Sequence, residues 1–219
     1  MLKRLNLFLL LISCFFGLQS CERKVSGQQN ENTTMDKNIS LKPNRIDSKK
    51  QLELEILKIA SAFENKDEKT LNTYLDKDLG FYLVPGPGTL LQYHKLEKID
   101  FSNGYIAYHQ FGKPLGDSFK MKYETFPIYD CENFEWDKLG IFVSSKYGSI
   151  LTWIVENPQN LVEGKIYTKE EIESINKIDK ITRPVIITKK DGDISFGIAK
   201  VKDKYIITYL EIYQSYCDI

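Results

Sequence analysis

The chain has 219 residues, of which 42% are hydrophobic and 12% aromatic, and this composition is sufficient for a packed core. Lysine and arginine together number 30, as do aspartate and glutamate, so the formal net charge is zero. A near-neutral chain offers no basic surface for phosphate groups, and this argues against a nucleic-acid partner.

The first twenty residues have the three zones of a secretory signal peptide. Lys3 and Arg4 form a short positive start, an apolar run extends over residues 5–16, and residues 17–20 interrupt it just before Cys21. The apolar run is too short to span a bilayer as a helix. We therefore expect residues 1–20 to be a signal peptide that is removed on export.

The residues before Cys21 resemble a lipobox, the processing site of bacterial lipoproteins. Leu18 lies three positions before the cysteine and the small Ser20 lies directly before it, as in that class, whereas Gln19 departs from the usual small residue. The resemblance implies lipid on the Cys21 sulfur and therefore a stable membrane anchor, with Glu22 weakly favouring the outer membrane. An uncleaved anchor, or an ordinary signal peptide with an incidental cysteine, is the alternative.

A polar, irregular segment follows the cysteine. Residues 21–46 lack apolar periodicity, so we expect a flexible tether between the membrane and a single domain over residues 47–219.

Two helices are predicted at the start of this domain. Ser48 and Gln51 have the spacing of a capping box at the start of the first helix, and apolar residues then recur at helical spacing through Phe63. The second helix is predicted over residues 67–75, with Asp67 as its N-cap and a short polar join before it.

Short strands and helices are predicted through the middle of the chain. The expected elements are a strand over 80–84 stopped by Pro85, a helix over 90–98, loops with one short strand over 101–131, strands over 139–144 and 149–156, and a helix over 169–177. Thr168 and Glu171 have the spacing of a capping box at the start of the last helix.

The end of the chain reads as an antiparallel meander of three strands over residues 184–189, 194–201 and 205–213. Asp191-Gly192 is a two-residue hairpin signal between the first two strands. Alternation in the last strand places Ile206, Leu210 and Ile212 on one side and Tyr205, Ile207, Tyr209 and Tyr213 on the other. Because both sides carry apolar bulk, this strand is expected to be central or to line a concave face.

Two helices, a strand, a break and a long meander together resemble the NTF2-like, or cone-shaped α+β, superfamily. Residues 62–71 look like the helix-turn-helix opening of that family, and residues 206–212 look like its closing sheet. The resemblance covers residues 48–213, with an insertion between 101 and 180. It implies an α+β fold in which an amino-terminal helical hairpin packs on a curved antiparallel sheet and leaves a pocket at the open end, a pocket that serves catalysis in some relatives and binding in others.

Four cysteines have separate expected fates. Cys14 leaves with the leader and Cys21 takes lipid, so Cys131 and Cys217 remain in the domain. Export to an oxidising compartment favours a disulfide between these two residues. Two buried free thiols are the alternative, because cysteine packs as a small hydrophobic residue.

Candidate catalytic residues lie in an aromatic stretch. Tyr108, His109 and Asp130 could transfer a proton next to a carbonyl group, but no triad or metal spacing accompanies them, so a structural role is favoured. His94 and His109 do not lie at zinc-ligand spacing from the cysteines, so neither a metal nor another cofactor is expected.

Aromatic residues also indicate a contact surface. Tyr209 lies on the tyrosine-rich side of the last strand, and the chain also contains Trp136 and Trp153. Tyrosine and tryptophan side chains favour contacts with a ligand or a protein. The alternative is that these side chains belong to the core of the sheet. We therefore expect a non-enzymatic, membrane-tethered envelope protein, outside the cytoplasm, that binds a small apolar ligand or an envelope protein through a concave aromatic face. The candidate pocket residues are Tyr108, His109, Asp130 and Tyr209. The alternative is a cone-fold enzyme of the isomerase or dehydratase type that acts by proton transfer.

Overall fold

The computed structural model describes residues 45–86, 92–116, 120–156, 167–213 and 217. The helices are α1 (Arg45–Glu64), α2 (Glu68–Asn72), α3 (Gly104–Ala107), α4 (Ile150–Glu156) and α5 (Lys169–Asp179). The strands are β1 (Phe81–Gly86), β2 (His94–Leu96), β3 (Met121–Lys122), β4 (Tyr129–Asp130), β5 (Glu135–Trp136), β6 (Gly140–Val143), β7 (Arg183–Lys189), β8 (Gly192–Val201) and β9 (Lys204–Tyr213).

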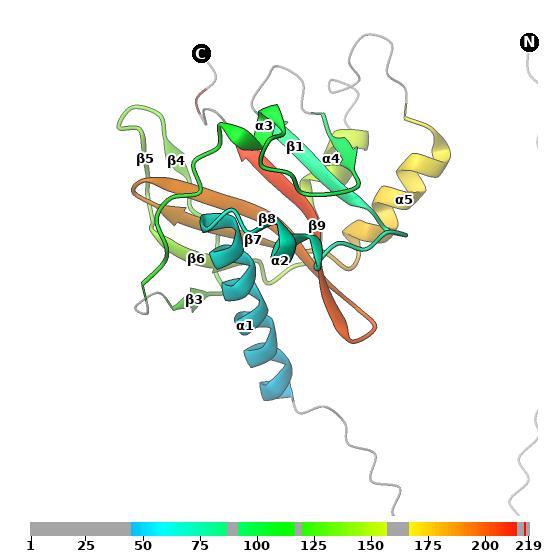
Figure 1. Ribbon diagram of the computed structural model, residues 1–219, viewed down its shortest axis with the longest axis horizontal. Coiled ribbons are helices and arrows are strands. Elements are labelled where there is room, and N and C mark those ends of the chain that lie inside the picture. Colours follow the sequence, from blue (N-terminus) through cyan, green and yellow to red (C-terminus); the bar gives the residue numbers. More distant parts are fainter. Residues whose placement is uncertain (1–44, 87–91, 117–119, 157–166, 214–216, 218–219) are drawn as a thin grey trace, which may run out of the picture. The chain divides into compact units, whose positions relative to one another are not determined.

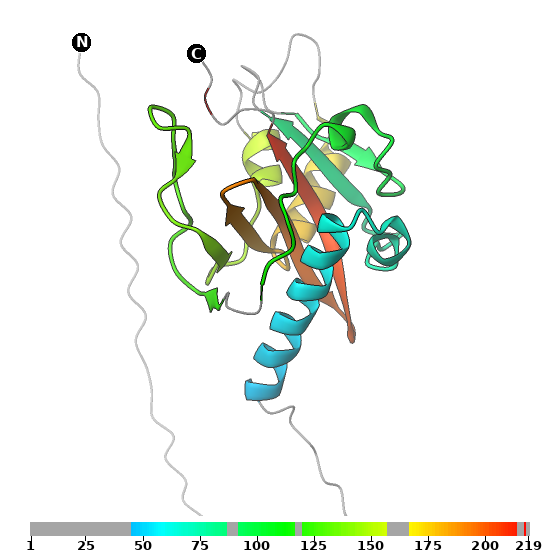
Figure 2. The ribbon, with the colours of Figure 1, turned by 60° about the vertical axis from the view of Figure 1, so that its left-hand side comes forward.

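Seven of the strands form one mixed sheet in the order β2-β1-β9-β8-β7-β6-β3. The pairs β1–β9 and β3–β6 are parallel, and the other neighbours are antiparallel. Helix α1 lies on one face of the sheet, and α4 and α5 lie on the other (Figures 1 and 2). The predicted α+β class is confirmed, and the predicted carboxyl-terminal meander is present as β7, β8 and β9. The sheet was predicted to be antiparallel, and this is wrong, because β1 and β3 lie parallel to their partners β9 and β6.

The face under α1 holds the larger part of the core. Ile56, Ile59 and Phe63 recur at helical spacing and are fully buried. They join a cluster that includes Phe81 and Leu83 of β1. Each fully buried side chain of this size contributes about 1.5–3 kcal/mol to stability, so the predicted apolar stripe of α1 is what holds the helix on the sheet.

The opposite face carries a second core beneath α4 and α5. Tyr82 and Val84 alternate with the first-face residues of β1 and pack here with Leu151 and Ile175. Strand β1 therefore buries both of its faces, as expected for a strand that lies inside a sheet with helices on both sides.

A β-bulge corrects the predicted sides of β9. The pairing shifts between Gly197 and Ile198 of β8, where Tyr209 and Ile207 are their respective partners, so one residue of β9 is extra. As a result Ile207 joins Leu210 in the cluster under α1, and Tyr209 lies in the other cluster. Simple alternation predicted that Ile207 and Leu210 lie on opposite sides of the strand, and this prediction is wrong.

Two helix starts are confirmed. The Asp67 side chain accepts a hydrogen bond from Thr70 N at 3.0 Å before α2. Thr168 and Glu171 form a reciprocal capping box before α5. The capping box predicted at Ser48 is wrong, because α1 begins three residues earlier at Arg45, so its backbone N–H groups near Ser48 already lie within the helix.

Three other local predictions are also wrong. Residues 94–96 form strand β2 instead of part of a helix, because they pair with β1 at the sheet edge. Residues 150–156 form helix α4 instead of a strand, with Leu151, Ile154 and Val155 buried at helical spacing. Strand β1 continues through Pro85, whose Cα partner is Ile212 of β9.

The described residues include no helix that is both long and apolar enough to cross a membrane. The predicted signal peptide, Cys21 and all but the last two residues of the predicted tether lie outside the described residues. Helix α1 includes those last two residues.

Candidate functional site

A two-stranded hairpin stands beside the main sheet (Figure 2). It consists of β4 and β5 with the turn between them, residues 129–136, and is called the arm below. Tyr129 and Trp136 are paired across it, and their ring centroids are 5.2 Å apart in an edge-to-face arrangement. Phe134 lies in the turn with a φ of 54° and a side chain that is 72% exposed. The arm therefore presents three aromatic side chains.

A disulfide attaches the arm to the end of the chain. Cys131, next to β4, is bonded to Cys217, and their Cα atoms are 5.5 Å apart. The predicted cysteine pair is confirmed. Cys131 itself is exposed, so this bond braces a surface element and not the interior of the sheet.

Residues 109–115 form a second element of the site, called the strap. The strap crosses the end of the β7–β8 hairpin, where Phe111 and Gly192 form an antiparallel bridge. Asp193 N donates to the carbonyl oxygen of Gln110 at 3.1 Å, and Lys113 N donates to Asp191 Oδ2 at 3.1 Å. The strap is thus held to the turn by both backbone and side-chain hydrogen bonds.

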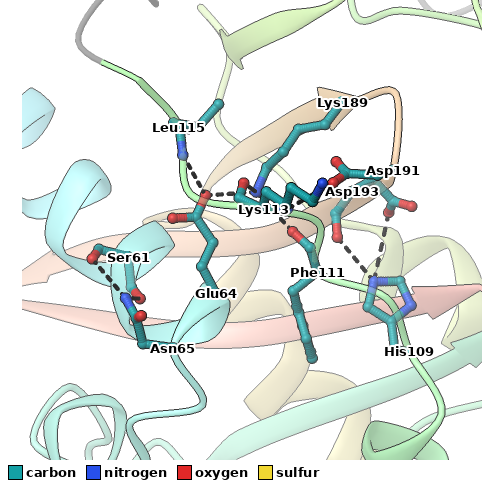
Figure 3. Close-up of polar contacts among 10 residues, drawn as sticks. All are labelled: Ser61, Glu64, Asn65, His109, Phe111, Lys113, Leu115, Lys189, Asp191 and Asp193. Atoms are coloured by element: carbon teal, nitrogen blue, oxygen red, sulfur yellow. Dashed lines mark hydrogen bonds and ion pairs between the residues drawn. The ribbon is translucent and has the colours of Figure 1, made fainter.

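A buried ion pair holds the strap from below. Lys189 Nζ lies 2.5 Å from Glu64 Oε1, and the two side chains are 6% and 3% exposed. The same ammonium donates to the carbonyl oxygens of Phe111 at 2.7 Å and Lys113 at 2.9 Å (Figure 3). These three contacts use all three of its N–H bonds. Glu64 Oε1 also accepts from Leu115 N at 3.2 Å. The ammonium is therefore fully hydrogen-bonded, and Oε1 of Glu64 accepts two hydrogen bonds, which is how a buried charge is tolerated.

His109 is held at the other end of the strap. Its side chain is 2% exposed, and Nε2 lies 2.9 Å from the carbonyl oxygen of Asp193 and 3.8 Å from the Asp193 carboxylate (Figure 3). The imidazole also packs edge-to-face on Phe111 with ring centroids 4.7 Å apart. These contacts orient the ring within the protein and fasten the strap to β8.

The arm, the strap and the β7–β8 turn enclose a groove of about 1070 Å³. Four aromatic residues line it, namely Tyr108, Tyr129, Phe134 and Trp136. Polar groups lie among them, namely His109, Gln110, Asn133, Glu135, Lys189, Lys190 and Asp193. Tyr108, directly before the strap, is 78% exposed. The groove thus combines rings that are available for stacking with amide and charged groups of both signs.

The residues predicted from the sequence to share a pocket are divided by the fold. Tyr108 and His109 line the groove. Asp130 lies on the arm, where its carboxylate accepts hydrogen bonds from the Asn133 side chain and from the backbone N–H groups of Glu132 and Asn133. These hydrogen bonds, first that of the Asn133 side chain, lower the pKa of Asp130. Its role in the structure is to close the turn of the arm.

Tyr209 lies away from the groove. It is 2% exposed and belongs to the cluster beneath α4 and α5. This side of β9 is therefore part of the sheet core, which was the alternative to a contact surface. His94, the other histidine, stacks on Tyr105 at the sheet edge with ring centroids 5.3 Å apart.

Several groove residues were not predicted. The predicted loops with one short strand over 101–131 cover only the first part of the arm, and no hairpin was predicted over Tyr129–Trp136. The pair of Lys189 and Glu64 left no sequence signal, because the two residues are 125 positions apart. Among the described residues no group of three or more His, Cys, Asp or Glu side chains is arranged to hold a metal ion.

The chain matches no family model, and neither the curated proteins nor the solved structures contain a significant match. The function is therefore inferred from the groove itself.

Proposed function

We propose that the chain is a lipid-anchored protein of the cell envelope and that its groove binds a segment of another extracytoplasmic protein. The observation that carries this proposal is the set of four aromatic side chains around the groove, two of which, Tyr108 and Phe134, are more than 70% exposed. Exposed aromatic residues that gather on one surface are typical of interaction sites.

The composition of the lining favours a protein over a small apolar ligand. Pockets for small apolar molecules are lined mainly by hydrophobic side chains. This groove instead places Gln110, Asn133, Glu135 and Lys190 among its rings. Aromatic anchors next to polar groups are what protein interfaces contain. Proton-transfer catalysis has less support, because His109 is engaged with Asp193 and the Asp130 carboxylate caps the turn of the arm.

The leader and the cysteine pair support the proposed location. The lipobox-like residues before Cys21 provide an anchor point, and a disulfide between Cys131 and Cys217 suits an oxidising compartment. Metabolic labelling with a fatty-acid analogue tests the anchor. We expect the parent chain to be labelled and a Cys21→Ser variant to be unlabelled, and equal labelling of the two would overturn the anchor.

We also propose that the domain is an elaborated member of the NTF2-like cone fold. Supporting features are the opening pair α1 and α2, the position of α1 across one face of the sheet, and the closing strands β7 to β9. Helices α4 and α5 cover the opposite face and belong to the segment that was expected to be an insertion.

Site-specific photo-crosslinking in the native envelope tests the binding function. A photoreactive amino acid replaces Phe134 in the groove or, as a control, Leu57, which is 41% exposed on α1. We expect a cross-linked protein from position 134 and not from position 57. We also expect Tyr108→Ala to reduce the yield at position 134, because it removes another aromatic ring of the groove. No adduct at position 134, or the same adduct at both positions, would contradict the proposal.

A further inference from the structure

The strand pairing of the arm is short. Two residue pairs join β4 to β5, and residues 131–135 are all exposed. A two-stranded hairpin in water is marginally stable at best. The arm nevertheless provides Tyr129, Phe134 and Trp136, three of the four aromatic residues of the groove. The integrity of one wall of the groove thus depends on what fixes the arm.

The disulfide is the covalent attachment that fixes it. Cys131 lies directly after β4 in the turn of the arm, and Cys217 lies beyond β9, a strand inside the main sheet. The bond therefore ties the arm to Cys217, which follows β9 in the sequence. The bridge lies at the surface, since Cys131 is exposed and Cys217 is partly exposed. Exposed disulfides are the ones that are accessible to thiol–disulfide exchange.

We propose that the Cys131–Cys217 bond is a reducible latch that keeps the groove formed, and that its reaction partner is an extracytoplasmic protein dithiol. In the oxidised state the arm is held in place and the groove is complete. In the reduced state the arm is released from Cys217, while the main sheet stays folded. The consequence for binding rests on the proposed function, whereas the motion of the arm does not.

The exchange balances without another reagent. A thiolate of the dithiol protein attacks the sulfur of Cys131, the Cys131–Cys217 bond breaks, and the Cys217 thiolate takes up a proton. The second thiolate of the dithiol protein then attacks its own sulfur in the mixed disulfide and releases Cys131, which is protonated in turn. Two electrons pass to the latch, and the dithiol protein leaves as a disulfide.

The two tryptophans of the chain allow a direct test. A Trp153→Phe variant leaves Trp136, on the arm, as the single tryptophan of the full chain. Acrylamide quenching of its fluorescence is measured in detergent before and after reduction by a phosphine. We expect the quenching constant to rise by about twofold on reduction, because local opening exposes side chains, while the far-ultraviolet circular dichroism stays unchanged.

Two matched variants provide the controls. Trp136→Phe leaves Trp153 on α4 as the reporter, and its quenching should not respond to reduction. Cys131→Ser in the Trp153→Phe background should show the high quenching constant with or without the phosphine. A Trp136 signal that reduction leaves unchanged overturns the latch, and so does a loss of the whole circular dichroism spectrum, since the bond would then hold the entire fold.

These outcomes are independent of the binding function, because no partner is present. If the latch holds, reduction should also abolish the adduct at position 134. If Trp136 responds to reduction but position 134 yields no adduct in either state, the latch stands and the proposed function fails.

Discussion

Lys189 on β7 donates to Glu64 at the carboxyl-terminal end of α1, with 2.5 Å between Nζ and Oε1. The same ammonium reaches two carbonyl oxygens of the strap. One buried cation thus connects the helix on the core face, the central meander and the segment that borders the groove (Figure 3). The arrangement makes the strap, and with it Tyr108 and His109, dependent on a contact far below the surface.

Replacing Lys189 by methionine should destabilise the protein strongly. The change leaves the buried Glu64 carboxylate without its counter-ion and removes two donors to the strap. Breaking a buried pair from one side typically costs about 3–5 kcal/mol. Chemical denaturation should show a loss of this size, and Lys190→Met, at the exposed neighbouring position, is the matched control. A loss below about 1 kcal/mol, within the range of a surface pair, would show that the pair does not hold the strap.

Replacing Gly192 by alanine should displace the strap. A Cβ atom there would lie 2.2 Å from Gln110 O and 2.4 Å from Gly112 N, which are backbone atoms. Overpacking of this kind costs about 1–3 kcal/mol. Gly116→Ala is the control, because its Cβ would meet nothing within 4 Å. Equal unfolding free energies for the two variants would mean that the strap does not approach β8 as closely as described.

Removing the capping box of α5 should have a smaller effect. In Thr168→Ala the backbone N–H of Glu171 loses the hydroxyl that accepts from it at 3.1 Å. An N-cap residue of this type contributes about 1 kcal/mol. The melting temperature should fall accordingly, whereas Thr125→Ala, at an exposed position outside any helix or strand, should leave it unchanged. A drop of equal size in both variants would contradict the assigned role.

Alkaline stability should depend on Tyr123. Burial, followed by the hydrogen bond to Glu53, raises the pKa of Tyr123 to about 12. The ordinary pKa of tyrosine is about 10. The folded state therefore favours the neutral phenol, and this contribution to stability is fully present below pH 10 and is lost as the pH rises to 12. In Tyr123→Phe the free energy of unfolding should fall less steeply across this interval. The control is Tyr108→Phe, and an unchanged slope in Tyr123→Phe would refute the assignment.

Much of the framework follows from local sequence patterns. The helical spacing through Phe63, the Asp67 cap and the box of Thr168 and Glu171 are short-range signals, and each appears in the structure as expected. The meander is likewise marked by three β-rich runs. The turn predicted at Asp191-Gly192 is displaced by one residue. Lys190 and Asp191 form the turn, and Gly192 is the first residue of β8. Its distinctive role is the close approach of the strap.

The errors arise where tertiary contacts decide. Residues 94–96 become a strand because β1 offers them an edge, and residues 150–156 become a helix because that spacing buries Leu151 and Ile154 beneath the sheet. The groove assembles Tyr108 and Trp136 from separate segments, and local periodicity carries no information about such pairs. The disulfide is a long-range contact that could be predicted, since only two cysteines were expected to remain in the domain and they allow a single pairing.

Affinity measurements with the purified cross-linked partner test the central claim most directly. Phe134→Asn removes an exposed groove ring, and asparagine tolerates the positive φ of the turn. Trp153→Ala removes another exposed aromatic side chain, on α4 and outside the groove. We predict that Phe134→Asn raises the dissociation constant by about tenfold or more, as for an interface hot spot, and that Trp153→Ala leaves it unchanged. Unchanged affinity in Phe134→Asn, or an equal loss in Trp153→Ala, would contradict the assignment of the groove as the binding site.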